Sequence, residues 1–145
     1  MRRIIIFLLV VSLCLSMNPI DIYGMHKEDL ISDMDVVLLS KEEIDLVGLV
    51  CLGEAEGEPE LGKRLVIDTI LNRMDSQKYP DNATDVCWQK GQYICLHNGR
   101  CSRLTVTDEI RQLVVEECMC RENNEVMYFS TASSNGLHVG AHYFR

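Results

Sequence analysis

The segment Ser40–Met74 reads SKEEIDLVGLVCLGEAEGEPELGKRLVIDTILNRM, and it decides the fold because it predicts two consecutive helices. Ser40 and Glu43 form a capping-box pattern directly before apolar residues that recur at helical spacing. The first helix is therefore expected to begin near Lys41. Pro59 fits the first turn of a second helix, which we expect to run to the end of the quoted segment.

The remainder of the chain predicts a loop region, a third helix and a short sheet. Turn-forming residues dominate 75–104, which indicates a long loop with one short helix around 85–88. An apolar stripe behind a threonine cap predicts a third helix over 107–121. We expect 126–130 to form a strand and 137–144 to be its antiparallel partner. The predicted class is α+β, with three main helices followed by a short C-terminal β-hairpin.

Length and charge limit the possible functions. The chain of 145 residues has the size of one domain, and its hydrophobic share of 47% is enough to build a core. Its 14 basic and 22 acidic residues give a formal net charge of -8. Such a field repels phosphate backbones, so we expect no binding to nucleic acid.

The beginning of the chain has the layout of an export signal. Two arginines precede the apolar run Ile4–Leu15, which is short for a membrane span. We therefore interpret 1–24 as a signal peptide or N-terminal anchor, 25–39 as a lead-in segment and 40–145 as the folded domain. The protein is expected to be exported, with membrane contact only through the N-terminal segment if the signal stays uncleaved.

Seven cysteines, one of them inside the predicted signal, are compatible with disulfides in an exported protein. Cys118 and Cys120 lie two positions apart on a predicted helix, so their side chains diverge and each needs a different partner. Cys51 is expected to be a buried thiol. The candidate partners lie in the preceding loop: Cys87, Cys95 and Cys101.

Glu54 is the candidate general acid. It follows Val47 by two helical turns, so it shares the direction of that residue on the apolar stripe with Val50 and Cys51. Burial disfavours the ionised form and raises a carboxyl pKa, as an acid that donates near neutral pH requires. The alternative is that the helix frays at Gly53 and that the carboxylate turns to water or caps the next helix.

The neighbouring acidic residues have simpler interpretations. Glu58 stands directly before Pro59 at a helix start, where its carboxylate can satisfy free amide groups. Glu56 is interpreted as a solvated charge. Asp68 and Glu58 are the only nearby competitors for the acid, and neither is favoured.

Four short motifs occur in order over about 41–145. They are GEAEGE at 53–58, the helix end NR at 72–73, GQY at 91–93 and VGAHYF at 139–144. Together they resemble the signature of the SleB/CwlJ-type cell-wall hydrolases, the spore-cortex-lytic enzyme family. Glu56 departs from the pattern, because many relatives carry arginine there.

The resemblance implies a peptidoglycan glycosidase with a small, lysozyme-like α+β domain over 40–145. It also implies that Glu54 is the catalytic acid. Members of the family are often described as lytic transglycosylases, and we expect neither a cofactor nor a metal. In that reaction the muramic 6-hydroxyl closes an anhydro ring, so no second carboxylate is needed. The expected partner is the glycan strand of peptidoglycan, and the expected location is outside the cell or at the wall.

Sugar binding requires aromatic platforms and hydrogen-bonding side chains. Tyr79 and Tyr128 are further aromatic candidates, and core packing is the alternative interpretation for every aromatic. The resemblance makes His142 a residue that braces the fold near the site. The expected substrate-binding residues are Asn72, Trp88, Gln92, Tyr93 and His142.

Two other functions stay open. His138 and His142 have ligand-like spacing and, with Cys118 and Cys120 upstream, can be drawn as a Cys/His zinc-binding module. The diverging cysteines and the oxidation of exported thiols speak against it. The second alternative is a catalytically inactive relative that binds the wall, against which the intact Glu54 argues.

Overall fold

The computed structural model describes residues 39–132 and 135–145. The predicted signal, and all of the lead-in segment except its final residue, lie outside the described residues. Within the described part, no helix is long and apolar enough to cross a membrane.

Two 15-residue helices, α4 (Lys41–Ala55) and α5 (Glu60–Met74), confirm the prediction for this segment. The capping box is present, because the Ser40 hydroxyl accepts the Glu43 amide at 3.2 Å and the Glu43 carboxylate accepts the Ser40 amide at 3.0 Å. A short connection then reverses the chain, and Pro59 caps α5.

The predicted loop region contains more helix than its composition indicates. α6 (Ala83–Trp88) is the expected short helix, while α7 (Ile94–His97) and the 3-10 turn η1 (Cys101–Arg103) were not predicted. Both are too short for a helical periodicity to appear. The third main helix, α8 (Asp108–Met119), confirms the prediction, with Thr107 as its cap.

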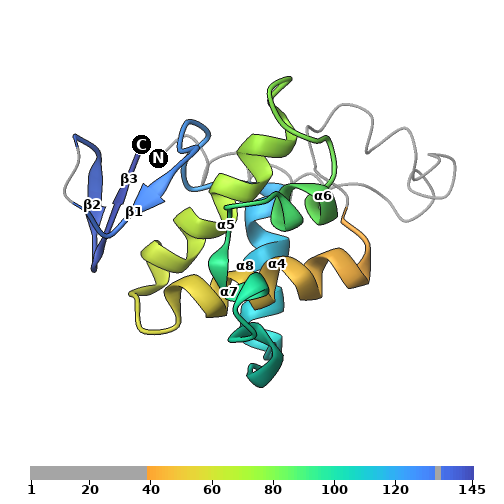
Figure 1. The fold of residues 1–145 in the computed structure, drawn as a ribbon. Coiled ribbons are helices and arrows are strands. Elements are labelled where there is room, and N and C mark those ends of the chain that lie inside the picture. The colour runs from red at the N-terminus through yellow and green to blue at the C-terminus, as the bar shows by residue number, and fades with distance from the viewer. Residues whose placement is uncertain (1–38, 133–134) are drawn as a thin grey trace, which may run out of the picture. The chain divides into compact units, whose positions relative to one another are not determined.

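The main core lies between α4, α5, α6 and α8. Figure 1 shows α4 crossing α5 and α8, with α6 and α7 lying over them on one side. Cys51 is fully buried there, and its thiol is 3.7 Å from the Lys63 carbonyl, as expected for a buried thiol. Fully buried aliphatic side chains fill this core: Val47, Val50, Ile67, Ile70, Leu71, Val86 and Val114.

The sheet has three short strands, β1 (Phe129–Ser130), β2 (Leu137–Val139) and β3 (His142–Phe144). Their order is β1-β3-β2, and both pairs are antiparallel. The single strand predicted over 137–144 is thus wrong in detail, because a turn divides it into the hairpin β2–β3. β1 pairs with β3, and the predicted α+β class with a C-terminal hairpin is confirmed.

A second, smaller core fastens the sheet to the helix pair. Phe144 of β3 is buried with Ala55 of α4 and with Leu65 and Val66 of α5. Val126, before β1, completes this cluster. The end of α4 is therefore packed from two sides, by the main core and by the sheet.

Gly140 is required at the hairpin turn. Its φ is 59°, and a Cβ there would overlap Glu58 Oε2, which accepts the Ala141 amide at 2.9 Å. Gly140→Ala is expected to lower the free energy of unfolding by roughly 2 kcal/mol or more, because backbone strain and a steric clash add. Urea denaturation measures the change.

Two glycines provide matched controls. Gly57→Ala meets no atom within 4 Å and has no positive φ, so it is expected to change stability by less than about 0.5 kcal/mol. Gly99 has a φ of 76° but equally open space, so Gly99→Ala isolates the strain. A Gly140→Ala effect no larger than that of Gly99→Ala contradicts the proposed clash.

Candidate active site

Glu54 lies in the last turn of α4, between buried Gly53 and Ala55. Its side chain is half-buried, and Oε1 accepts a hydrogen bond from the Cys95 amide of α7 at 3.1 Å. The helix continues through this residue to Ala55, so fraying at Gly53 does not occur. The carboxyl group is thus fixed at one oxygen by a backbone donor while part of its surface stays accessible.

The GQY motif explains why α7 lies against α4. Gly91 has a φ of 83° and Tyr93 a φ of 36°, so the backbone turns sharply at both residues. The Tyr93 ring is buried, and its hydroxyl accepts from Arg73 Nη1 at 3.1 Å. The turn and the buried ring together place the Cys95 amide, two residues later, on Glu54.

Arg73, in the last turn of α5, is buried and contacts several distant parts of the chain. Its side chain donates to the Met127 carbonyl at 2.9 Å and to Gln92 Oε1 at 2.9 Å. The guanidinium carbon lies 5.2 to 5.4 Å from the ring centres of Tyr79, Tyr93 and Tyr128. Cation–π contact and hydrogen bonds therefore join α5 to the GQY turn and to the segment before β1.

Asn72 and Tyr93 are occupied by the protein. Asn72 is buried, its amide donates to the carbonyls of Asn123 and Val126, and its oxygen accepts from Arg121. The side chain of Asn72 therefore has structural contacts, and the substrate-binding role expected of it stays a prediction. Tyr93 is likewise buried against Arg73, so core packing is the better interpretation of this ring.

His142 and Glu58 join the sheet to the start of α5. His142 is buried on β3, with its ring 5.3 Å from that of Phe129 in an edge-on contact. Its Nδ1 lies 3.7 Å from Glu58 Oε1. His142 thus braces the fold as the family motif implies. The substrate contact also expected of His142 stays a prediction.

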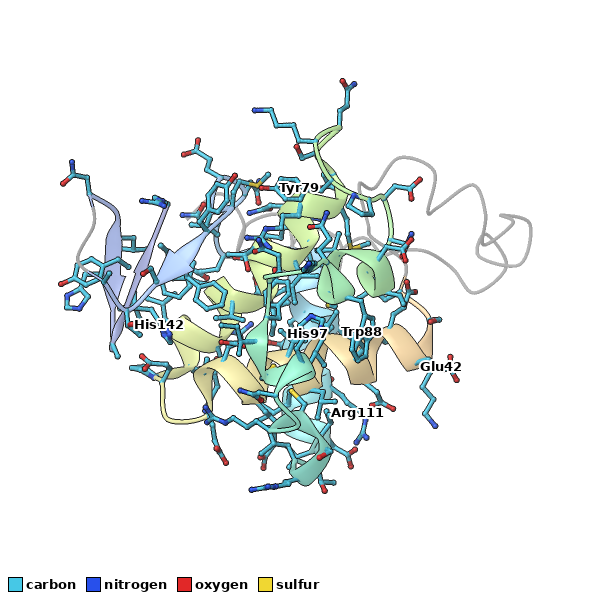
Figure 2. All side chains as sticks on the ribbon, viewed as in Figure 1. Glu42, Tyr79, Trp88, His97, Arg111 and His142 are labelled. Atoms are coloured by element: carbon cyan, nitrogen blue, oxygen red, sulfur yellow. The ribbon has the colours of Figure 1, made fainter. Side chains whose placement is uncertain are left out.

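Trp88 is an exposed aromatic residue whose ring contacts α7. Half of its surface is accessible, and its ring meets that of His97 edge-on at 5.6 Å. Figure 2 shows Trp88 and His97 side by side on the face formed by α6 and α7. Ile94, at the start of α7, is 63% exposed. An apolar surface therefore adjoins the helix that donates to Glu54.

Asp68 is buried with a second acid, Glu117 of α8. Asp68 Oδ2 accepts the Asn123 amide at 2.7 Å, while Glu117 is paired with Arg64 at 2.7 Å. Burial, and then the hydrogen bond and charge of Glu117, raise the pKa of Asp68 to about 8. This carboxyl group is enclosed between α5 and α8, so it cannot compete with Glu54 for a glycan.

Glu58 and Glu56 also have defined positions. Glu58 makes a structural contact, but its carboxylate accepts the Ala141 amide of the hairpin turn rather than an amide at the start of α5. Glu56 is exposed and lies 3.5 Å from Arg100. Neither carboxylate shares the position of Glu54 beneath α7.

The zinc-binding alternative receives no support from the geometry. Within residues 39–132 and 135–145, no three His, Cys, Asp or Glu side chains gather in a way that could hold a metal ion. His138 instead stacks on the Tyr143 ring at 4.3 Å. Cys118 is buried and Cys120 exposed, and the cysteines of the described part are free thiols. The bridges predicted from Cys118 and Cys120 are not formed in this structure, in which Cys95 and Cys101 are free thiols as well.

Sequence reasoning missed the amide that holds Glu54 and the ring contacts of Arg73. The GQY motif was the available signal for the Cys95 amide. Its glycine indicates a turn, but it does not indicate the contact that the backbone makes two residues beyond the motif. The signal for the ring contacts was the presence of several tyrosines, which have no common spacing. The burial of Glu117 was not predicted, because a charged residue inside an amphipathic helix normally faces solvent.

Comparison with known proteins identifies relatives of the described domain. Residues 57–144 match the sequence model of the Cell Wall Hydrolase family. The spore cortex-lytic enzyme of Halalkalibacterium halodurans is 34% identical over 61 residues, which are 42% of this chain and 18% of that protein. That of Oceanobacillus iheyensis is 28% identical over 116 residues, 72% of this chain and 42% of that protein. The chain thus spans less than half the length of these curated relatives.

Two solved structures share the fold. The catalytic domain of the germination-specific lytic transglycosylase SleB from Bacillus anthracis has a TM-score of 0.64 and 23% identity, covering 73% of this chain and 95% of that one. The catalytic domain of the Bacillus cereus SleB protein has a TM-score of 0.65 and 23% identity, covering 83% and 98%. The predicted lysozyme-like fold class is confirmed. Glu54 lies just before the range of the family match.

The buried Asp68 predicts an unusual pH dependence of stability. Its pKa in the folded state lies above the unfolded value, so the folded state holds the proton more tightly and loses stability as pH rises from about 4 to about 8. Asp68→Asn keeps an acceptor for Asn123 and cannot ionise. Between pH 5 and pH 8, we expect the free energy of unfolding of the variant to rise relative to that of the wild type by on the order of 2 kcal/mol.

Urea denaturation at several pH values measures this difference. Asp81→Asn, at an exposed aspartate, is the control and is expected to follow the wild type at every pH. A constant difference between Asp68→Asn and the wild type across the range contradicts the raised pKa.

Proposed function

The chain belongs to the Cell Wall Hydrolase family, and on this premise we propose that it cleaves the glycan strand of peptidoglycan with Glu54 as its single acid/base. The family predicted from the four motifs is thereby confirmed. The observation that carries the proposal is the Glu54 carboxyl group, half-buried at the end of α4 and held by the Cys95 amide.

The reaction that this arrangement favours is lytic transglycosylation. Protonated Glu54 donates its proton to the glycosidic oxygen while positive charge develops at the sugar ring. The muramic 6-hydroxyl then attacks C1, the C–O bond to the leaving sugar breaks, and the hydroxyl proton passes to the Glu54 carboxylate. The products are a 1,6-anhydro end and a new terminal sugar, and Glu54 is protonated again.

The surroundings of the other carboxylates support a mechanism with one acid. Hydrolysis by two carboxyl groups needs a second one at a set distance across the scissile bond. Glu58 is engaged by the Ala141 amide, and Asp68 is buried between α5 and α8. Glu56 is exposed and next to Arg100. Each of these three groups has a role that does not require substrate.

Trp88, with His97 and Ile94, is proposed as a platform for the sugar rings. Exposed aromatic faces bind the apolar faces of sugars, and this surface adjoins the helix that donates to Glu54. Gln92 is half-buried with its carbonyl oxygen fixed by Arg73, which leaves its amide group in a set orientation for hydroxyl or acetamido groups.

The wall is the proposed location as well as the substrate. The family acts on cell-wall material, and a signal or anchor at 1–24 would bring the domain there. The net charge of -8 does not favour long-range attraction to an acidic polymer. Affinity is therefore proposed to come from short-range contacts with the sugars.

Glu54→Gln is expected to reduce digestion of purified peptidoglycan by at least about a hundredfold, because the amide cannot donate the proton. The Gln side chain still accepts the Cys95 amide, so the circular dichroism spectrum should not change. Glu56→Gln, at the exposed neighbouring glutamate, is the matched control and should keep nearly full activity.

The products decide among the remaining mechanisms. Mass spectrometry of the digest shows 1,6-anhydro ends for transglycosylation and reducing ends for hydrolysis. A Glu54→Gln variant as active as Glu56→Gln refutes the role of Glu54. A wild-type protein that sediments with peptidoglycan without digesting it identifies the inactive wall-binding alternative.

Trp88→Ala is expected to raise the KM for soluble glycan fragments roughly fivefold with little change in kcat, because a platform binds ground state and transition state alike. Met119→Ala removes a similarly exposed side chain from α8 and is expected to leave KM unchanged. Equal KM values for the two variants contradict the platform.

A further inference from the structure

Two buried thiols lie beside Glu54 and have no part in the proposed reaction. Cys95 belongs to α7 and Cys101 to η1, and both are almost completely inaccessible. A Cβ placed on Gly53 would lie 2.5 Å from Cys95 Sγ and 2.8 Å from Cys101 Sγ. The two sulfur atoms therefore converge on the same point of the α4 backbone, one residue before Glu54.

The loop between the two cysteines is shaped to bring them together. Gly99 has a φ of 76°, and the Asn98 side chain accepts the Arg100 amide at 2.9 Å. These contacts reverse the chain between α7 and η1. Cys101 Sγ is also 3.6 Å from the Leu49 carbonyl, which fixes η1 on α4.

The chemical state of the thiols fits a pair rather than a nucleophile. Burial, and then the hydrogen bond with Cys101, raise the pKa of the Cys95 thiol above its ordinary value. Burial raises the pKa of Cys101 as well. Both groups are thus protonated at neutral pH in the folded protein, and neither is an activated thiolate.

We propose that Cys95 and Cys101 are a disulfide site that locks the loop 95–101 beside Glu54. The bridge fixes the helix whose amide holds the Glu54 carboxyl group. The formation of the bridge is independent of the proposed function, whereas its effect on activity rests on the role proposed for Glu54.

The oxidant is a small disulfide such as oxidised glutathione, acting while the protein folds in oxidising surroundings. One thiolate attacks the oxidant, whose S–S bond breaks to release a first thiol and leave a mixed disulfide. The second cysteine displaces the remaining thiol and forms the Sγ–Sγ bond. The two cysteines lose two protons and two electrons, and one disulfide becomes two thiols.

The main competitor is Cys87. This thiol is buried in the same core, and the charge of Cys101 contributes to raising its pKa to about 12, although burial is the larger cause. The alternatives are a bridge between Cys95 and Cys101 and a bridge from either of them to Cys87. The contacts of Gly53 favour the first, because the sulfur atoms next to this glycine are those of Cys95 and Cys101.

Trypsin makes the test direct, because Arg100 lies between the two cysteines. The protein is reduced, unfolded and refolded with reduced and oxidised glutathione. It is then alkylated without reduction and digested. Mass spectrometry is expected to find peptide 91–100 (GQYICLHNGR) joined to peptide 101–103 (CSR), with the cysteines at positions 51, 87 and 118 alkylated.

Alkylated 91–100 and 101–103 as separate peptides from the refolded protein overturn the proposal. So does a bridge from either peptide to 79–90, which carries Cys87. Cys87→Ala is the matched control, since it removes an equally buried thiol and should keep the 91–103 bridge. This readout does not depend on activity, so the bridge and the role of Glu54 succeed or fail separately.

The functional effect is measured on the same samples. Dithiothreitol is expected to lower the melting temperature of the bridged wild type and of Cys87→Ala by a few degrees and to slow peptidoglycan digestion severalfold. A Cys95→Ala/Cys101→Ala variant should not respond to dithiothreitol. If dithiothreitol changes neither the melting temperature nor the activity of the bridged protein, the bridge does not stabilise the loop 95–101 beside Glu54.

Discussion

The site depends on one buried cation. The guanidinium group of Arg73 is only 2% exposed, and its hydrogen bonds go to a backbone carbonyl, an amide oxygen and a phenol. Three tyrosine rings surround it and supply the negative faces that a desolvated cation requires. Because these partners come from distant parts of the sequence, the cation makes one unit of α5, the GQY turn and the approach to β1. The position of the amide on Glu54 depends on that unit.

The three glutamates of the GEAEGE motif illustrate how neighbouring identical side chains acquire different roles. Glu54 faces α7 and receives an amide from it, and Glu58 receives an amide from the hairpin turn. Glu56 lies between them on the outside, near Arg100. Glu54 lies in the last turn of α4, which ends at Ala55. Glu56 lies in the connection, and Glu58 directly precedes the start of α5. Three side chains spaced two residues apart thus have three different partners: an amide of α7, Arg100 and an amide of the hairpin turn.

The helices could be predicted from the sequence because their signals are local. A capping box, a proline and an apolar period lie within the segments that they define, and α4, α5 and α8 begin where these signals occur. The sheet was predicted less well, since the pairing of β1 with β3 depends on contacts between distant residues. The candidate site shows the same division: the position of Glu54 on α4 follows from helical spacing. The structural use of Asn72 became visible only with its partners at 123 and 126, which no local pattern indicates.

The strand order has a consequence for how the protein is made. β3 is the central strand of the sheet although it comes last among the strands in the chain. During translation the helices can pack as they leave the ribosome, but β1 and β2 have no neighbour until residues 142–144 emerge. Glu58 meets the Ala141 amide only at the same late moment. A nascent chain therefore carries Glu54 and Glu58 before the sheet that packs against the end of α4 can form, and this side of the domain is the last to be completed.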